Sequence, residues 1–243
     1  MKILRNIIPA IKLYYALRYL HPYKKSMHSA RIAGDDIAEQ KAILGATDCW
    51  GRNVLRMFDV NLTIVGAENL PKEGPVVYVS NHLGYGDIPT YCAALNTIQF
   101  GFIARDDLGK IPVYGTWIKN VRSVMMNRED ARSSLRSIEE GIELIKRGFS
   151  LLIFPEGTRS KGGPIQEFKR GSLRLATKAG VPVIPLTMMG TSQMFEERGI
   201  ITKGAQVKIV IHPPIETAGM EKSRASNLAK EVEDIVKSSY VGV

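Results

Sequence analysis

The sequence predicts an α/β fold: a mostly parallel sheet of about seven strands flanked by helices, with a two-helix segment at the N-terminus. Two observations lead to this prediction. From residue 60 onward, short β-rich runs alternate with helical stretches, a pattern typical of parallel strands joined by crossover helices. The composition, 44% hydrophobic and 23% charged over 243 residues, is that of a globular protein with a full core and rules out wholesale disorder.

The runs expected to form strands are rich in valine, isoleucine and leucine, and span 60–65, 75–80, 98–104, 122–126, 150–154, 182–188 and 206–212. The expected helices span 88–95, 130–147, 170–179 and 220–238. The helix at 130–147 has the clearest pattern, because its apolar residues recur every three or four positions. We expect residues 1–58 to form a basic, membrane-associating helical segment and residues 59–243 to form one α/β domain.

The positive charge of the chain is concentrated at its N-terminus. The net charge is +9, from 33 Lys and Arg against 24 Asp and Glu. The first carboxylate is Asp35, and the residues before it include seven basic ones: Lys2, Arg5, Lys12, Arg18, Lys24, Lys25 and Arg31. A basic segment on a nearly neutral body indicates an anionic partner, either lipid headgroups or nucleic acid.

Residues 3–20 also carry an apolar stripe, which falls on one side of a helix opposite most of the basic residues. Pro9 is expected to kink this helix or mark its start, and residues 35–58 are expected to form a second helix. The stripe is too short and too interrupted by charge for a transmembrane span or a secretory signal. With its basic flank, the stripe predicts a helix that lies in a membrane surface. We expect a peripheral or monotopic protein on the cytoplasmic face of the cell membrane, bound through residues 1–31. The alternative is a helix packed on its own domain.

A histidine and an aspartate follow the second expected strand, in the order Asn81-His82-Leu83-Gly84-Tyr85-Gly86-Asp87. Asp87 could accept a hydrogen bond from one ring nitrogen of His82, which would leave the other nitrogen free as a general base. Asp87 could equally be a helix N-cap. The chain has no Gly-x-Ser-x-Gly motif, so a base at His82 would act on a nucleophile that the substrate supplies, such as a hydroxyl.

Arginines follow three of the other expected strands. The strand at 150–154 continues as Phe154-Pro155-Glu156-Gly157-Thr158-Arg159-Ser160, a tight loop that presents Glu156, Thr158 and Arg159. Arg105 and Arg128 follow the strands at 98–104 and 122–126. If these strands are parallel, the three arginines converge beside His82 and form an anion site. Each could otherwise be a surface charge, and Glu156 could pair with Arg159.

Together these residues resemble the glycerolipid acyltransferase family, and within it the 1-acyl-sn-glycerol-3-phosphate (lysophosphatidic acid) acyltransferases. Four blocks of that family occur in order: Asn81-His82-x4-Asp87, Val124-Met125-Met126-Asn127-Arg128, Phe154-Pro155-Glu156-Gly157-Thr158-Arg159-Ser160 and Val181-Pro182-Val183-Ile184-Pro185. The chain departs from the family in two places. Gly84 stands where the family usually has serine, and Met126-Asn127 precedes Arg128 where an Ile-Asp pair is common.

The resemblance implies that His82, oriented by Asp87, deprotonates the sn-2 hydroxyl of lysophosphatidic acid, which then attacks an acyl thioester to give phosphatidic acid. Arg128 and Arg159 are expected to hold the phosphate, and Glu156 to contact the glycerol, on the loop with Gly157 and Thr158. Arg105 is a further candidate for neutralising the phosphate or the developing oxyanion. No metal and no cofactor are implied, with acyl-CoA or acyl carrier protein as co-substrate.

Three other functions are compatible with the sequence. A related acyltransferase could act on glycerol-3-phosphate or another lysolipid, and the motifs do not separate these acceptors. A lipid-binding protein could retain the motif without activity. A nucleic-acid-binding protein would use the basic segment, but the chain shows no helix-turn-helix or RNA-binding signature.

Overall fold

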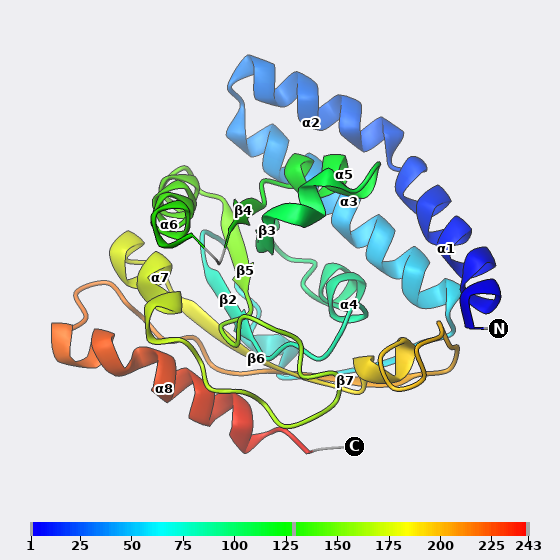
Figure 1. The fold of residues 1–243 in the computed structure, drawn as a ribbon. Helices are drawn as coiled ribbons and strands as arrows, with labels where there is room; N and C mark the ends of the chain where they lie inside the picture. The colour runs from blue at the N-terminus through cyan, green and yellow to red at the C-terminus, as the bar shows by residue number, and fades with distance from the viewer. Residues whose placement is uncertain (1, 128–129, 242–243) are drawn as a thin grey trace.

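A computed structural model describes residues 2–127 and 130–241 of the chain, and Figure 1 shows its fold. Its strands form one sheet in the order β1-β7-β6-β2-β5-β3-β4. All neighbouring strands are parallel except β6 and β7. The strands are β1 (Asn61–Val65), β2 (Val77–Ser80), β3 (Phe100–Arg105), β4 (Val124–Met126), β5 (Ser150–Ile153), β6 (Val183–Met189) and β7 (Gln206–Ile211). The predicted fold class and the seven predicted strands are confirmed.

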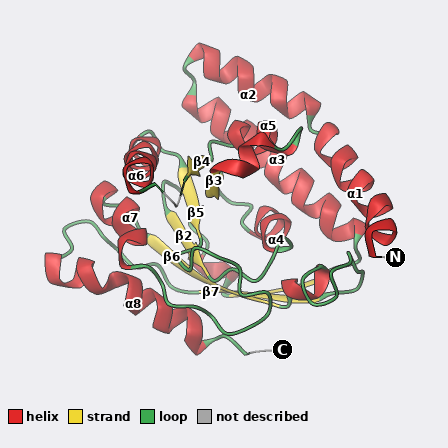
Figure 2. Cartoon of the chain, in the orientation of Figure 1, coloured by secondary structure: helices red, strands yellow, loops and turns green. Residues whose placement is uncertain are grey.

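Helices cover both faces of this sheet (Figure 2). The α-helices are α1 (Lys2–Arg18), α2 (His21–Ala33), α3 (Asp36–Met57), α4 (Asp87–Ala94), α5 (Tyr114–Asn120), α6 (Ala131–Lys146), α7 (Arg174–Ala179) and α8 (Lys222–Ser238). Short 3-10 turns occur at Ala67–Asn69, Asp106–Lys110, Arg170–Leu173 and Thr191–Met194. In Figure 2, α6, α7 and α8 lie on one side of the sheet, and α4, backed by α3, lies on the other. The central strands are therefore buried on both faces, and every residue of β2, β5 and β6 is buried.

The N-terminal segment holds one helix that the sequence pattern did not predict. α2 begins with a proline, Pro22, in its first turn, and ends at Gly34, whose φ of +69° is the left-handed conformation that favours glycine at a helix end. α1 runs through Pro9 without a break in the helix, so Pro9 does not mark a start. Among the described residues, no helix has both the length and the apolar character needed to cross a membrane.

The core of the body extends into the N-terminal segment. Leu17 near the end of α1, Leu20 directly before α2, Met27 on α2 and Val54 on α3 belong to the same buried cluster as the central strands. α3 packs closely on α4, because an added Cβ on Gly51 would lie 2.5 Å from the backbone nitrogen of Ala93. The division at residue 58 stays a prediction about function, since residues on both sides of it share one core.

Glu233 on α8 is a buried carboxylate that fixes this helix to the loop after β5. Its Oε2 accepts a hydrogen bond from the backbone N–H of Phe168 at 2.7 Å, and its Oε1 accepts from Nζ of Lys237 at 2.8 Å and of Lys230 at 3.1 Å. Burial acts to raise the pKa of Glu233, but the hydrogen bonds and the ammonium charges outweigh it and lower the pKa to about 2.

We expect Glu233 to make the stability of the fold depend on acidity. Because the folded pKa lies below the ordinary 4.5, charged Glu233 stabilises the fold above about pH 4.5, and this contribution is lost as the pH falls toward 2. Glu233→Gln should reduce the free energy of unfolding by about 2 kcal/mol near neutral pH, measured by urea denaturation, and by less in acid. Glu231→Gln, at an exposed ion pair with Arg224, is the control. A difference from wild type that is independent of pH would contradict this assignment.

Candidate active site

The loops that follow β2 and β5 meet at the carboxyl edge of the sheet, near its centre. β2 lies between β5 and β6 and is parallel to both, so the segments after these three strands emerge side by side. The side chain of Asn81 continues the pairing beyond the end of β2. It donates to the carbonyl of Met188 at 2.9 Å and accepts from the Met188 N–H at 2.8 Å. The backbone directly before His82 is therefore fixed to β6.

His82 and Asp87 are in direct contact, as their spacing predicted. Nδ1 of His82 lies 2.6 Å from Oδ2 of Asp87. The Asp87 side chain is fully buried, whereas that of His82 is 18% exposed. Because Asp87 can only accept here, Nδ1 carries the proton and Nε2 is left as the basic nitrogen. The imidazole also stacks on the ring of Phe154, with centroids 4.0 Å apart, and this packing fixes its plane.

Asp87 organises the whole loop rather than the imidazole alone. Oδ2 also accepts the backbone N–H groups of Leu83 at 2.8 Å and Gly84 at 3.1 Å, and Oδ1 accepts from the hydroxyl of Thr191. The alternative of an N-cap does not hold, because Asp87 is the first residue of α4 and its side chain folds back onto the loop before the helix. A carboxylate with this many donors is held in one position, as orientation of His82 requires.

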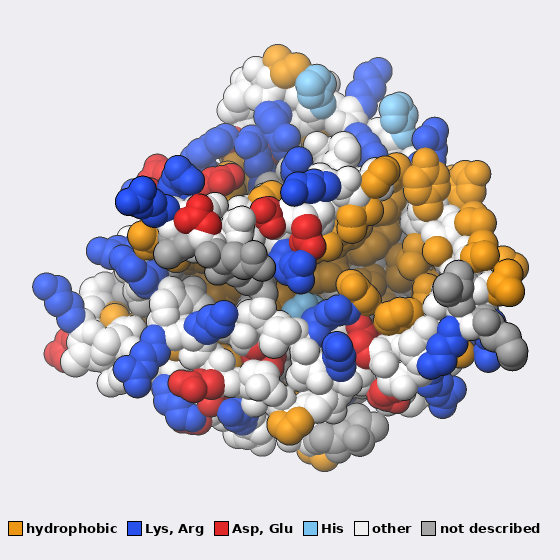
Figure 3. Space-filling model, viewed as in Figure 1, with side chains coloured by type: hydrophobic (Ala, Val, Ile, Leu, Met, Phe, Trp, Pro, Cys, Tyr) orange, Lys and Arg blue, Asp and Glu red, His pale blue; other side chains and the backbone are white. Residues whose placement is uncertain are grey.

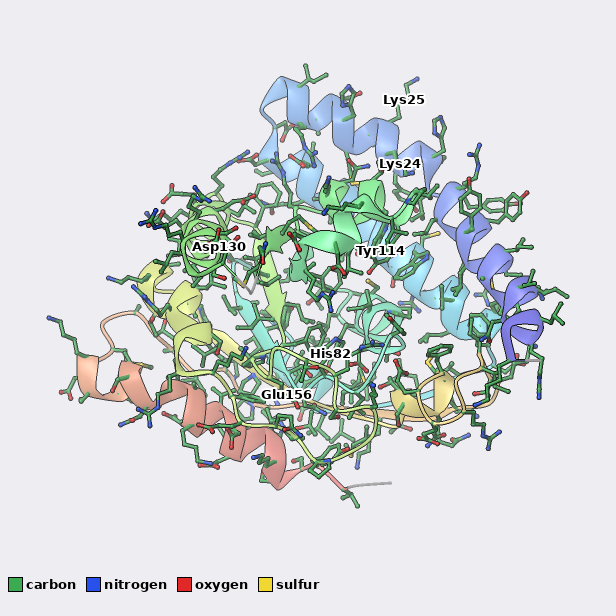
Figure 4. All side chains as sticks on the ribbon, viewed as in Figure 1. Lys24, Lys25, His82, Tyr114, Asp130 and Glu156 are labelled. Carbon is green, nitrogen blue, oxygen red and sulfur yellow. The ribbon has the colours of Figure 1, made fainter. Side chains whose placement is uncertain are left out.

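Glu156 holds the backbone of His82. Its Oε1 accepts the His82 N–H at 2.6 Å and its Oε2 accepts the Gln166 N–H at 2.8 Å. The carbonyl of His82 accepts the Ser160 N–H at 2.8 Å, so the segment after β5 binds both the backbone N–H and the backbone carbonyl of His82. Burial raises the pKa of Glu156, and these backbone hydrogen bonds act against that rise. Figure 4 shows Glu156 and His82 close together at the centre of the molecule.

These contacts do not support the predicted contact between Glu156 and glycerol. The residue is only 5% exposed, and both carboxylate oxygens accept hydrogen bonds from backbone donors. Its place is behind the site, where it positions His82. The sequence motif located Glu156 but could not predict these contacts, because a backbone N–H group is present whatever the residue type.

Arg159 and its loop lie beside His82, as predicted. Gly157 has a φ of +75°, which turns the chain back so that Thr158 and Arg159 line the same pocket as His82. The guanidinium carbon of Arg159 lies 3.8 Å from the centroid of the Tyr85 ring, and Nη1 donates to Oε1 of Glu196 at 3.0 Å. The possible pairing of Arg159 with Glu156 does not occur, because Glu196 is its acidic partner.

The other two predicted arginines have different outcomes. Arg105 lies at the rim of the pocket, with a side chain that is 62% exposed and pairs with Asp107 through Nη2 and Oδ2 at 2.5 Å. Arg128 lies outside the described residues, so its place beside the phosphate stays a prediction.

An apolar pocket of about 690 Å³ opens at His82 and extends toward the N-terminal helices. This volume is within the usual range of about 300–1,000 Å³ for small-molecule sites. Its lining combines the His82 loop and Arg159 with apolar residues from α1, α3, β3 and α5, among them Leu13, Tyr14, Leu17, Trp50, Val54, Phe102 and Ile118. Figure 3 shows the orange side chains around a hollow beside α1. One end of the pocket is thus polar and basic, and the rest is apolar.

Two residues of the site were not predicted from the sequence. Thr191 reaches Asp87 from a position 104 residues later in the chain, and Glu196 reaches the backbone N–H of Tyr85 from 111 residues later. Both lie in the connection between β6 and β7, which the motifs do not include. Within residues 2–127 and 130–241, no group of three or more His, Cys, Asp and Glu side chains is arranged to hold a metal ion.

Comparisons with known proteins identify the family and the fold that this chain is similar to. A family model described as Acyltransferase matches residues 61–189. A chloroplastic 1-acyl-sn-glycerol-3-phosphate acyltransferase from Brassica napus is 41% identical over 155 residues, which are 63% of this chain and 44% of that protein. The 1-acyl-sn-glycerol-3-phosphate acyltransferase of Borreliella burgdorferi is 31% identical over 179 residues, 73% of this chain and 71% of that protein.

The chain spans about half the length of the plant relatives that it matches, 44% and 49%. A solved structure covers more of it. The crystal structure of the 1-acyl-sn-glycerophosphate (LPA) acyltransferase from Thermotoga maritima superposes with a TM-score of 0.73 at 28% identity, over 98% of this chain and 95% of that one. The similarity therefore includes the N-terminal helices as well as the sheet.

Proposed function

Because the chain belongs to the acyltransferase family, we propose that it transfers a fatty acyl group to the sn-2 hydroxyl of 1-acyl-sn-glycerol-3-phosphate and so makes phosphatidic acid. The acyl donor is a thioester, acyl-CoA or acyl carrier protein. One observation carries the proposal: a histidine oriented by a buried carboxylate opens on an apolar pocket that also holds Arg159. The relatives named above support the choice of acceptor.

The chemistry follows from the free nitrogen of His82. Nε2 takes the proton of the acceptor hydroxyl while its oxygen attacks the thioester carbonyl carbon, and Asp87 stabilises the imidazolium that forms. The tetrahedral intermediate then collapses, the carbon–sulfur bond breaks, and His82 returns the proton to the departing sulfur. The products are an ester and a free thiol. No acyl-enzyme intermediate is needed, because the substrate provides the nucleophile.

The two ends of the pocket suit different parts of the substrate, the basic end its phosphate and the apolar end its acyl chain. Arg159 binds the phosphate of the acceptor through a charge-assisted hydrogen bond. Arg105 at the rim is a second, more exposed cation for the phosphate or the oxyanion, and Arg128 is a third. The apolar lining from α1, α3, β3 and α5 accommodates acyl chain.

A transfer assay with purified protein tests this function. The acceptors are lysophosphatidic acid, glycerol-3-phosphate and other lysolipids, each with acyl-CoA and with acyl carrier protein as donor. We expect the highest kcat/KM with lysophosphatidic acid. A preference for glycerol-3-phosphate would overturn the acceptor and keep the reaction, whereas no transfer to any acceptor would overturn the function.

We propose further that α1 adsorbs to an anionic membrane and admits lipid to the pocket. Large apolar side chains on α1 are exposed, including Leu4 at 72%, Ile8 at 66% and Ile11 at 49%. Tyr14 is 42% exposed and also lines the pocket, so the exposed surface of α1 continues into the pocket. Figure 3 shows this orange surface with basic side chains around it, and in Figure 4 Lys24 and Lys25 extend from α2.

An acidic residue in the apolar surface of α1 should detach the protein from lipid. Ile8→Glu should weaken partition onto anionic vesicles by about ten-fold or more, because burial of an isoleucine contributes about 1.5–3 kcal/mol. Sedimentation with vesicles of mixed phosphatidylglycerol and phosphatidylcholine measures this. Leu135→Glu is the matched control, because Leu135 is 49% exposed and its helix, α6, lies away from α1 in Figure 1. Equal partition of wild type and both variants would show that α1 does not contact the membrane.

A further inference from the structure

Glu196 is a carboxylate buried in the wall of the candidate active site. Its side chain is 3% exposed, and it belongs to none of the four sequence blocks. Burial raises the pKa of Glu196, while the hydrogen bond from the Tyr85 N–H and the charge of Arg159 act in the opposite direction. A buried carboxylate is costly unless its neighbours stabilise it, so its contacts indicate what it does.

The contacts of Glu196 all lead to Arg159 and to the loop between His82 and Asp87. Oε1 accepts the backbone N–H of Tyr85 at 2.8 Å and Nη1 of Arg159 at 3.0 Å. The Tyr85 ring lies under the guanidinium, 3.8 Å from centroid to carbon. Arg159 is thus held at one nitrogen by Glu196 and at one face by Tyr85. Among the described contacts, the carboxylate uses only one of its nitrogens, which leaves further N–H groups for a ligand.

Glu196 also occupies the space beside Gly84. A Cβ added to Gly84 would lie 2.2 Å from Oε2 of Glu196, far inside van der Waals contact. Oε2 is buried and accepts no hydrogen bond from any described residue. Glu196 therefore fills the volume that a side chain at position 84 would need, so any residue larger than glycine there requires the Glu196 carboxylate to shift.

We propose that Glu196 is a positioning residue for acyl transfer, which holds Arg159 in the orientation that binds the acceptor phosphate and which a larger residue at position 84 would displace. This inference rests on the proposed function for its kinetic part only. In the alternative role, Glu196 competes with the acceptor phosphate for Arg159 and neutralises its charge. The two roles predict opposite signs, because loss of a positioning group weakens phosphate binding and loss of a competing charge strengthens it.

The kinetic test compares Glu196→Ala and Glu196→Gln in the full chain. Removal of the acceptor of a charge-assisted hydrogen bond should raise KM for lysophosphatidic acid about ten-fold in Glu196→Ala, with a smaller change in kcat. Glu196→Gln retains an oxygen for Arg159 and Tyr85 and should restore most of the wild-type KM. Glu197→Gln, at the neighbouring exposed carboxylate that accepts from Ser192, should leave KM unchanged. A KM that falls or stays constant in Glu196→Ala overturns the positioning role.

A stability test needs no enzymatic activity, so it separates failure of this inference from failure of the proposed function. Gly84→Ala should lower the Tm in the wild-type background, because the new Cβ meets Glu196. In the Glu196→Ala background the same substitution should lower the Tm much less, because the space is vacant. Equal losses of Tm in the two backgrounds would show that Glu196 does not determine the residue at 84.

Discussion

Replacement of His82 by alanine is expected to lower the rate of acyl transfer by about 10²–10⁴-fold, the usual contribution of a general base. The effect should fall on kcat rather than on KM, because the variant keeps Arg159 and the apolar pocket, the groups proposed to bind the substrates. Steady-state kinetics with lysophosphatidic acid and acyl-CoA measure it. The prediction depends on Nδ1 being 2.6 Å from Asp87, which leaves Nε2 as the nitrogen available to act as a base.

Two controls separate loss of the base from loss of the fold. His28→Ala replaces an exposed histidine on α2 and should retain full activity. The Tm of His82→Ala should stay close to wild type, because the Asp87 carboxylate keeps its hydrogen bonds from Leu83, Gly84 and Thr191. If His82→Ala transferred acyl groups at the wild-type rate, another group would be the base.

Among the variants considered, replacement of Glu39 by alanine is expected to reduce the free energy of unfolding the most. Glu39 on α3 is fully buried, and its carboxylate is bound by two arginines. Arg122 makes a two-point contact at 2.8 and 2.7 Å, and Arg31 donates from Nε at 2.9 Å. These pairs join α2 and α3 to the segment before β4. Arg31, one of the seven basic residues near the N-terminus, therefore stabilises the fold.

Glu39→Ala should reduce the free energy of unfolding by about 3–5 kcal/mol, because it leaves two guanidinium groups partly buried without their partner. Urea denaturation followed by circular dichroism measures the change. Asp36→Ala, on the same helix, removes a more exposed partner of Arg147 and should cost about 1 kcal/mol or less. A loss in Glu39→Ala no greater than in Asp36→Ala would contradict the role of this buried network.

Local sequence was sufficient to predict a helix or strand where its apolar residues recur with a clear period or form a run of typical length. The buried strands are short runs of β-branched and apolar residues, and all of them were found within one or two residues. α2 was missed because His21–Ala33 mixes charged and small residues without a continuous apolar stripe, and its stability comes from packing on α3 and from the Arg31–Glu39 pair. α5 was missed because Tyr114–Asn120 is only 7 residues long, too short for a helical period to be recognised.

In the site, likewise, contacts between residues close in the sequence could be predicted, and contacts between distant residues could not. His82 and Asp87 are five residues apart on one loop, so their spacing could predict their contact. Thr191 and Glu196 come to that loop from more than 100 residues away, and only the topology of the sheet brings them there. Glu156 was located by its motif, but its two backbone contacts were not predicted, because backbone N–H groups carry no residue identity.

A double-mutant cycle on His82 and Asp87, measured as kcat/KM for lysophosphatidic acid, tests the central claim most directly. If Asp87 acts through the imidazole, Asp87→Asn should slow wild type strongly but should have little further effect in the His82→Ala background. Losses that multiply in the double variant would show that the two residues act independently, and that result would contradict the account.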